Sequence, residues 1–260
     1  MAKDTNKLAV VTGAGSGIGR TVALALSHKR LTVLAAGRRL RPLKETADIA
    51  VSGVKPVSAD VATAAGRAAI VSELGEDRVH FLVHAAGTMP IQRLTDITPE
   101  TWRQVMATNL DARLHLTQAL IPNLTPGGRV LFIGSMSATK ARKGSTAYCT
   151  SLAASFMLQE CLKLELAQHA ILVTNAIPGP VNTRMLQVGM AADVDVFPDS
   201  AEYGALRKQG KLIEPETVGR FYAWLLTQTD DQSYSANQWD IRDESHHDAW
   251  IGSRGLYDAP

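Results

Sequence analysis

Cysteine is scarce in this chain of 260 residues, which contains two, Cys149 and Cys161. Two cysteines are too few for a disulfide framework, and their spacing does not match a metal-binding motif. Both fall in an apolar segment with a helical pattern, so we expect them to be buried free thiols. His246, His247 and Asp248 stand in a charged tail, where we expect them to be solvated rather than to bind a metal, because a metal site needs three or four converging ligands.

Excess charge and long apolar runs are also absent. The chain has 27 Lys and Arg against 25 Asp and Glu, a formal net charge of +2, so its composition predicts no strong attraction to nucleic acid or to a membrane surface. No stretch reaches the ~18 apolar residues that a membrane span needs, and the polar N-terminal residues do not resemble a signal segment. We therefore expect a cytoplasmic protein with neither nucleic acid nor membrane as a partner.

Apolar segments alternate with helical patterns along the chain. We expect strands at residues 8–11, 31–36, 54–59, 79–84, 129–133, 171–176 and, briefly, 238–242. We expect helices at residues 20–26, 43–50, 63–74, 99–109, 112–121, 145–167 and 216–226. Wholly apolar strands separated by helices predict a parallel sheet with helices on both faces. The predicted fold class is therefore α/β, a Rossmann-type doubly wound parallel sheet, with right-handed crossovers.

One domain over residues 1–260 is expected, because no repeat, low-complexity tract or Pro/Ser-rich linker divides the chain. Residues 188–210 have mixed charge and no clear period, and we expect them to be irregular. The wider segment 182–213 is predicted to form a lid over a substrate, since long loops in compact folds are often functional. Residues 243–260 are expected to be a C-terminal tail.

A glycine-rich turn follows the first expected strand. It carries Gly13, Gly17 and Gly19 in the pattern Thr-Gly-x3-Gly-x-Gly. Glycines lack a Cβ, so the backbone can turn tightly and approach a pyrophosphate. The helix that follows offers unpaired N–H groups to the anion. The alternative is a tight turn with no ligand, but the position after an N-terminal strand favours a nucleotide site at the carboxyl ends of the strands.

The end of the second expected strand suggests which nucleotide binds. An acidic residue for the ribose of NAD is missing there, and Arg38 and Arg39 follow instead. A guanidinium suits a 2′-phosphate, so the sequence favours NADP(H) over NAD(H). The alternatives are that Arg38 stacks on adenine or that both arginines are solvated. Asp60, after the third strand, is expected either to accept from the adenine amino group or to cap the next helix.

Taken together, further motifs resemble the short-chain dehydrogenase/reductase family over residues 6–242. They are Thr12-Gly13-x3-Gly17-x-Gly19, Asp60-Val61, Ala85-Ala86-Gly87, Asn109, Ser135, Tyr148 and Pro178-Gly179-Pro180-Val181-x-Thr183. The resemblance implies hydride transfer between a nicotinamide cofactor and a carbonyl or secondary alcohol. It places the cofactor against Gly13, Ser16, Gly17, Ile18, Gly19, Arg38, Asp60, Val61, Ala86, Gly87, Tyr148, Pro178, Gly179, Val181 and Thr183. It also implies a homodimer or homotetramer, paired through helices 112–121 and 145–167.

The same resemblance assigns three catalytic residues. Ser135 binds the substrate oxygen, Tyr148, thirteen residues later, transfers the proton, and Asn109 holds a water molecule in a proton relay. A phenol ordinarily has a pKa near ~10. The family lowers it with a lysine four residues after the tyrosine, on the same helical face.

That lysine position is Leu152 here. A leucine carries no charge and donates no hydrogen bond, so several interpretations are open. The enzyme turns over with the cationic nicotinamide ring, Lys140, Arg142 or Lys143 supplying part of the field. Alternatively, it binds nucleotide as a sensor or scaffold, or the lysine was replaced deliberately. A lyase or epimerase with tightly held NAD is a further alternative. The family's Asn-Asn-Ala-Gly is also changed, beginning here with His84, which we interpret as a satisfied core histidine.

Overall fold

Seven strands form one sheet at the centre of the molecule, in the order β3-β2-β1-β4-β5-β6-β7. This computed structural model describes residues 7–236, 238–252 and 254–258, so the ends of the predicted domain and of its tail lie outside the described residues. Every strand pairs in parallel with its neighbour. The strands are β1 (Leu8–Thr12), β2 (Thr32–Gly37), β3 (Val54–Ser58), β4 (Val79–His84), β5 (Leu124–Ile133), β6 (Leu172–Ile177) and β7 (Gln238–Asp240).

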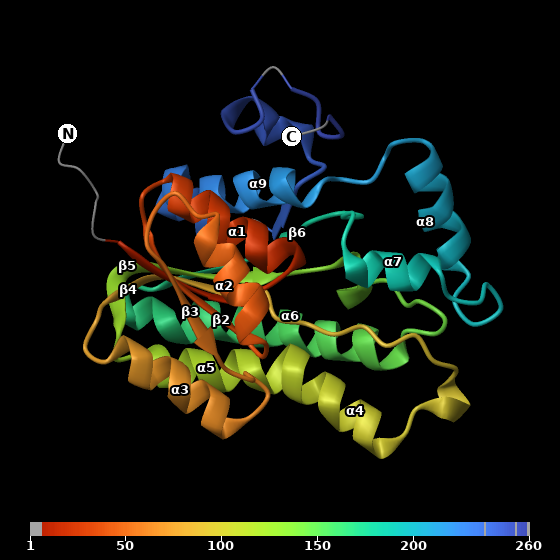
Figure 1. Ribbon diagram of the computed structural model, residues 1–260, viewed down its shortest axis with the longest axis horizontal. Helices are drawn as coiled ribbons and strands as arrows, with labels where there is room; N and C mark the ends of the chain where they lie inside the picture. The colour runs from red at the N-terminus through yellow and green to blue at the C-terminus, as the bar shows by residue number, and fades with distance from the viewer. Residues whose placement is uncertain (1–6, 237, 253, 259–260) are drawn as a thin grey trace.

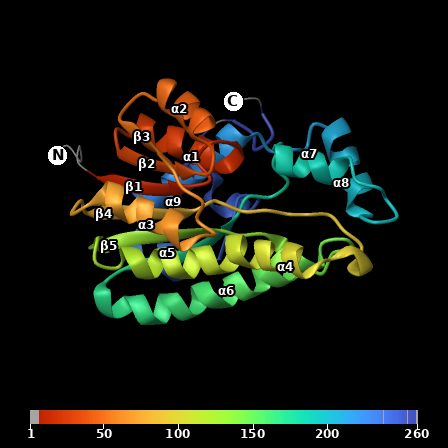
Figure 2. The ribbon, with the colours of Figure 1, turned by 60° about the horizontal axis from the view of Figure 1, so that its bottom comes forward.

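Helices cover both faces of this sheet (Figures 1 and 2). One face carries α1 (Gly17–His28), α2 (Leu40–Asp48) and α9 (Pro215–Gln228). The other carries α3 (Ala64–Leu74), α4 (Pro99–Met106), α5 (Ala112–Leu120) and α6 (Thr146–Leu166). The remaining helices and turns are η1 (Leu94–Asp96), η2 (Ala107–Asp111), η3 (Met136–Ala138), η4 (Ala167–His169), α7 (Arg184–Met190), α8 (Asp199–Lys208), α10 (Asp231–Ala236) and η5 (Glu244–Ala249).

Two apolar cores separate these helices from the sheet. Neighbouring residues of β1 point to opposite faces, so Val11 packs in the core with Phe221 of α9, while Val10 packs in the core with Leu116 of α5. This arrangement confirms the predicted α/β doubly wound parallel sheet. Within the described residues, no helix has the length and apolar content required to cross a membrane.

The segment 188–210 was expected to be irregular, and that prediction is wrong in part. Residues 188–190 end α7 and residues 199–208 form α8, whereas 191–198 are turns. Thr183 caps α7, because its hydroxyl accepts from the backbone N–H of Leu186. Helix α8 has acidic residues in its first turn and basic residues in its last turn, which suits the helix dipole. Helix α7 is short, and α8 is largely polar with few apolar residues to reveal a helical pattern.

The expected burial of both cysteines is also wrong. Cys149 is half-buried and Cys161 is exposed on α6. The outward face of this helix also exposes Met157 and Leu164, so its apolar pattern does not face the core of this chain alone. The two tail histidines depart from expectation in the other direction, because His246 and His247 are half-buried and bond the main-chain oxygens of Asp240 and Ile241. No group of three metal-ligating side chains occurs in the described part of the chain.

His84, at the end of β4, is a satisfied core histidine, as predicted. Its side chain is buried, and Nε2 lies 2.9 Å from the hydroxyl oxygen of Thr117 on α5. Burial, with a smaller contribution from the Arg113 guanidinium, lowers the pKa of His84 to about 3. The folded protein therefore keeps this imidazole neutral well below the pH at which an exposed histidine takes up a proton.

We predict that His84 destabilises the fold in mild acid. Above pH 6.5 the imidazole is neutral in both states; below it, only the unfolded chain takes up the proton, until the pH approaches the folded pKa. The wild type should lose about 2 kcal/mol of unfolding free energy through His84 between pH 6.5 and 5.0. His84→Asn, which keeps a polar partner for Thr117, should lack this loss. Urea unfolding at several pH values measures it; equal acid slopes in the two proteins would contradict the prediction.

Candidate active site

The hydroxyl of Thr12 holds the ends of β1 and β4 together. It donates to the main-chain oxygen of Val83 at 3.2 Å and accepts from the N–H groups of Ala85 at 3.0 Å and Ala86 at 3.1 Å. The strand order reverses between these two strands, because β1 leads outward to β2 and β4 leads outward to β5. In open α/β sheets, ligands bind in the crevice at such a point.

The glycine turn lines this crevice, and its main chain packs directly against neighbouring main chain. A Cβ on Gly13 would lie 2.9 Å from Ala86 Cα, and one on Gly19 would lie 2.5 Å from the main-chain oxygen of Gly13. Gly17 begins α1 with φ +53°, which disfavours residues with a side chain. Ser16, before it, makes no side-chain cap to α1. The start of α1 therefore keeps N–H groups that suit an anion.

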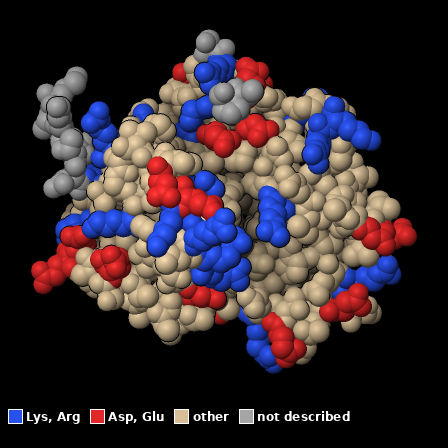
Figure 3. All heavy atoms as spheres, in the orientation of Figure 1, with Lys and Arg blue, Asp and Glu red and all other residues tan. Residues whose placement is uncertain are grey.

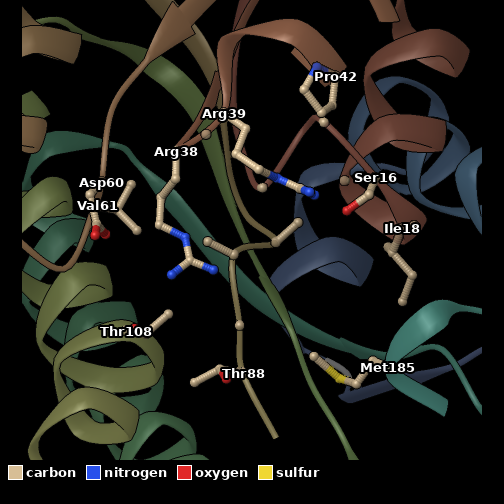
Figure 4. Close-up of a pocket in the computed structure, with 18 of the residues that line it drawn as sticks. Ser16, Ile18, Arg38, Arg39, Pro42, Asp60, Val61, Thr88, Thr108 and Met185 are labelled. Carbon is tan, nitrogen blue, oxygen red and sulfur yellow. The ribbon is translucent and has the colours of Figure 1, made fainter. Parts of the chain in front are cut away.

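A first cavity runs along the glycine turn, and two arginines that follow β2 line its outer part. Figure 4 shows Arg38 and Arg39 reaching into it, with Ser16 and Ile18 on one side and Asp60 and Val61 on the other. Among the described residues, neither arginine forms an ion pair with a carboxylate.

The helix-cap alternative for Asp60 is wrong. Thr63 is the N-cap of α3, and its hydroxyl accepts from the N–H of Gly66 at 3.0 Å. Asp60 instead accepts from the N–H of Ala62 at 3.1 Å, within the turn that precedes the helix, and it lines the cavity. Its position is therefore consistent with contact to the adenine, which stays a prediction.

A second cavity, of about 370 Å³, continues from the first. The two share Ile18, Ala86, Gly87 and Thr183 in their linings, so they form one groove. Figure 3 shows a hollow near the middle of this face of the molecule with Lys and Arg side chains beside it. Every residue predicted for the site lines this groove, and the second cavity gathers Asn109, Ser135, Tyr148, Pro178, Gly179 and Val181. Residues from eight separate segments thus lie along one groove, and their roles in it stay predictions.

Ser135 and Tyr148 face each other in the second cavity. Ser135 follows β5, and its hydroxyl accepts from the N–H of Ser137 at 3.1 Å. Burial raises the pKa of Tyr148, while its hydrogen bond with Ser135 and the nearby Arg113 and Arg142 lower it. The half-buried phenol therefore lies next to one hydroxyl and near two cations. Such a group can donate a proton to an oxygen placed beside it.

Asn109 lines the second cavity and links two of the segments around it. It lies in η2, a π-helical turn between α4 and α5, and is fully buried. Its Oδ1 accepts from the N–H of Thr88 at 2.9 Å, and its Nδ2 donates to Thr88 O at 2.9 Å and to the Ser151 hydroxyl at 3.0 Å. The side chain thus joins the segment after β4 to α6. Its role in a proton relay stays a prediction.

Of the three side-chain cations expected to replace the missing lysine, two lie outside the second cavity. Leu152 is buried and lines the second cavity, but Lys140 and Lys143 are exposed and do not line it. Arg142 does line it, and its guanidinium is paired with Asp199. The cation that the sequence analysis missed is Arg113 of α5, which lines the cavity near Tyr148. The available signal was its position four residues after Asn109, one helical turn along.

Helices α7 and α8 form the outer wall of the second cavity. Met185 and Leu186 line it, whereas Val188 of the same helix is exposed. Arg142, in the turn before α6, fastens this wall through its ion pair with Asp199 at the start of α8, and its Nε donates to the Ser137 hydroxyl at 3.1 Å. Both partners are largely buried, so this pair is screened less than a surface pair.

We predict that Asp199→Asn loosens α7 and α8 without unfolding the sheet. Arg142 would lose its charged partner, and backbone amides in residues 184–208 should exchange with solvent at least several-fold faster, as measured by hydrogen exchange with mass spectrometry. Asp193→Asn is the matched control, because Asp193 makes an exposed ion pair with Arg93 at 3.9 Å and accepts from the N–H of Asp195, a bond that an asparagine side chain can keep. If both variants exchange alike, the Arg142 pair does not hold the wall.

Comparisons with known proteins agree with this geometry. A family model described as short chain dehydrogenase matches residues 7–192. Uncharacterized oxidoreductases of Staphylococcus epidermidis and Staphylococcus aureus are each 32% identical to the chain, over 193 residues (72% of this chain and 83% of the relative) and 229 residues (86% and 92%).

Solved structures of oxidoreductases also resemble this chain. A protein named as an NAD(P)-dependent gluconate 5-dehydrogenase from Beutenbergia cavernae, with NADP bound at low occupancy, is 30% identical, with TM-score 0.74 and coverage of 90% of this chain and 93% of its own. L-sorbose reductase from Gluconobacter frateurii, complexed with NADPH and L-sorbose, has TM-score 0.79 at 23% identity, covering 91% and 95%, and it shows a shared fold.

Proposed function

We propose that this chain, which belongs to the short-chain dehydrogenase family, is an NADP(H)-dependent reductase of ketones or aldehydes and oxidises the corresponding alcohols in reverse. The observation that carries the proposal is the pairing of Ser135 with Tyr148 in a cavity that continues into the glycine-lined groove. The substrate is a small molecule, because the second cavity has room for about 370 Å³.

The groove fits a nicotinamide dinucleotide. A Cβ at Gly13 or Gly19 would collide with the main chain of Ala86 or of Gly13, so these glycines permit the tight turn, and the start of α1 offers N–H groups to a pyrophosphate. Arg38 and Arg39 suit a 2′-phosphate, and Asp60 lies where the adenine would end. Pro178, Gly179, Val181 and Thr183 would lie beside the nicotinamide. When bound, this cofactor supplies the hydride equivalent for the reduction. The NADP-bound relative from Beutenbergia cavernae supports this choice of nucleotide.

The chain's own residues then handle the substrate oxygen. Ser135 donates a hydrogen bond to the carbonyl oxygen and orients it, while Tyr148 gives that oxygen its proton as the carbon is reduced. In the reverse direction, Tyr148 takes the proton from the alcohol. Apolar side chains of α7 and α8, among them Leu186 and Leu206, keep water from this end of the cavity.

Two copies of the chain are proposed to pair through α5 and α6. The outward face of α6 exposes Met157, Cys161 and Leu164 at helical spacing. Leu164 is 79% exposed and Met157 is 60% exposed, which is unfavourable for large apolar side chains in an isolated chain. Pairing of copies would bury this face.

A nucleotide-binding sensor or scaffold is the second candidate, and Leu152 is the observation that favours it. It predicts tight NADPH binding with no turnover of any carbonyl. The reductase and the sensor therefore differ in one measurable property, which is turnover that depends on Tyr148.

We predict that Tyr148→Phe abolishes turnover and leaves cofactor binding almost unchanged. Loss of the proton donor should lower kcat by at least about 100-fold, while the dissociation constant for NADPH should change by less than about threefold. The assay is NADPH oxidation against a panel of ketones and aldehydes, with fluorescence titration of NADPH. Tyr234→Phe is the matched control, since Tyr234 is buried outside the groove and bonds Val130 O. NADPH binding without turnover in the wild type would favour the sensor.

We predict that Arg38→Ala combined with Arg39→Ala weakens NADPH binding selectively. Two guanidinium contacts to a phosphate should be worth about 10- to 100-fold in the dissociation constant, whereas NADH binding should change by less than about threefold. Arg41→Ala is the nearby control, in the first turn of α2, because Arg41 is exposed and pairs with Glu45. Equal losses for NADPH and NADH would show that the arginines do not read the 2′-phosphate.

A further inference from the structure

Arg113 is a buried cation without a carboxylate partner among the described residues. Its side chain is 4% exposed. Nη1 donates to the Ser155 hydroxyl at 2.8 Å and Nη2 donates to Ile133 O at 3.2 Å, while Nε has no hydrogen-bond partner in the described chain. Burying a charge among neutral groups is costly. We therefore looked to the neighbouring groups for one that the positive charge of Arg113 stabilises.

Two hydrogen bonds join the η2–α5 segment to α6 beside the second cavity. Asn109 bonds Ser151, and Arg113 bonds Ser155. In each segment the two positions are four residues apart, so they lie on one face of their helix. Tyr148 and Leu152 are spaced in the same way on α6 and line the same cavity as Arg113. The guanidinium is thus brought from α5 to the part of α6 that carries the tyrosine.

Leu152 provides no positive charge near the Tyr148 hydroxyl, and Arg113 can provide one. The leucine is buried and lines the cavity with no charge or donor to offer Tyr148. Arg113 interacts electrostatically with Tyr148: the tyrosine raises the pKa of Arg113, against a larger lowering by burial that brings it to about 10. The guanidinium therefore stays charged at neutral pH, and it lowers the pKa of Tyr148 in return.

The other groups around the phenol do not replace this cation. Ser135 after β5 is neutral, Cys149 is the neighbour on α6, and Tyr203 approaches from α8. Arg142 lowers the pKa of Tyr148 least among the contributing groups and is already paired with Asp199. On the far side of Arg113, His84 is held neutral, so it neither adds to the charge nor cancels it.

Given the proposed reductase function, on which this inference rests, we propose that Arg113 is a positioning residue that supplies from α5 the positive charge that Leu152 cannot supply to the Tyr148 hydroxyl from α6. The phenol gives up its proton to the substrate oxygen, and the guanidinium stabilises the phenolate that remains. Arg113 keeps its own protons throughout, because its role is electrostatic.

The first test needs neither cofactor nor substrate. Protein labelled with 13C at the tyrosine ζ carbon is titrated by NMR, and the Tyr148 signal is assigned by its loss in Tyr148→Phe. Arg113→Met keeps the length of the side chain and removes its charge, and we expect the Tyr148 titration to move up by about one pH unit or more. Arg113→Lys keeps a charge and should move it by less than half as much.

A matched control separates charge from packing. Arg129→Met makes the same change at another buried arginine, which bonds the main-chain oxygens of Leu225 and Thr229 and does not line the groove. It should lower the thermal midpoint without moving the Tyr148 titration. If Arg113→Met does not fold, Arg113→Gln, which retains a donor for Ile133 O, takes its place. An unchanged Tyr148 titration in a folded, uncharged variant would overturn the proposal.

The second test is a rescue across the two helices. Arg113→Met should shift the pH profile of kcat upward and lower kcat at neutral pH by about 10-fold or more, and Leu152→Lys in that background should restore most of the loss. A failed rescue together with an unmoved pH profile would overturn the proposal. Absence of Tyr148-dependent turnover in the wild type would instead overturn the reductase function, while the NMR titration would still judge Arg113.

Discussion

The contact between the glycine turn and the end of β4 is the constraint on which the rest of the site depends. Thr12 satisfies two N–H groups and one main-chain oxygen there, and Gly13 lets the two chains approach without a side chain between them. The approach places the start of α1 opposite Ala86 and Gly87, where the two cavities meet. Any side chain at Gly13 would push the nucleotide-binding and catalytic halves apart, so both share one backbone arrangement.

Much of this arrangement can be predicted from the sequence, because it rests on local patterns. Apolar strands alternating with helices predict the doubly wound sheet, and fixed spacings such as thirteen residues between Ser135 and Tyr148 identify groups that meet. Features that depend on contacts between distant segments cannot be predicted in this way. Helix α8 is largely polar, and the exposure of Cys161 depends on which face of α6 the sheet covers. The environment of Arg113 is set by a neighbouring helix, so no spacing within α6 reveals it.

A cation placed on α5 instead of α6 differs in how rigidly it is held, as well as in its position. A lysine at position 152 would hang from the same helix as Tyr148 and would move with it. Arg113 is instead held by the Ser155 hydroxyl and by a main-chain oxygen of β5, so its plane is fixed by two different elements. A guanidinium is planar and spreads its charge, whereas an ammonium is compact and flexible. The arginine therefore gives a field of fixed direction, whose effect depends on α5 and α6 keeping their spacing.

The buried charge also links the electrostatics of the site to its outer wall. Water in the second cavity would screen Arg113 from Tyr148, since the interaction of two charges falls as the dielectric constant rises. Helices α7 and α8 form the outer wall of the cavity, and Arg142 pairs with Asp199 at the start of α8. If this wall limits the entry of water while the proton moves, the Arg142–Asp199 pair strengthens the interaction between Arg113 and Tyr148, although Arg142 itself has only a small direct effect on the phenol.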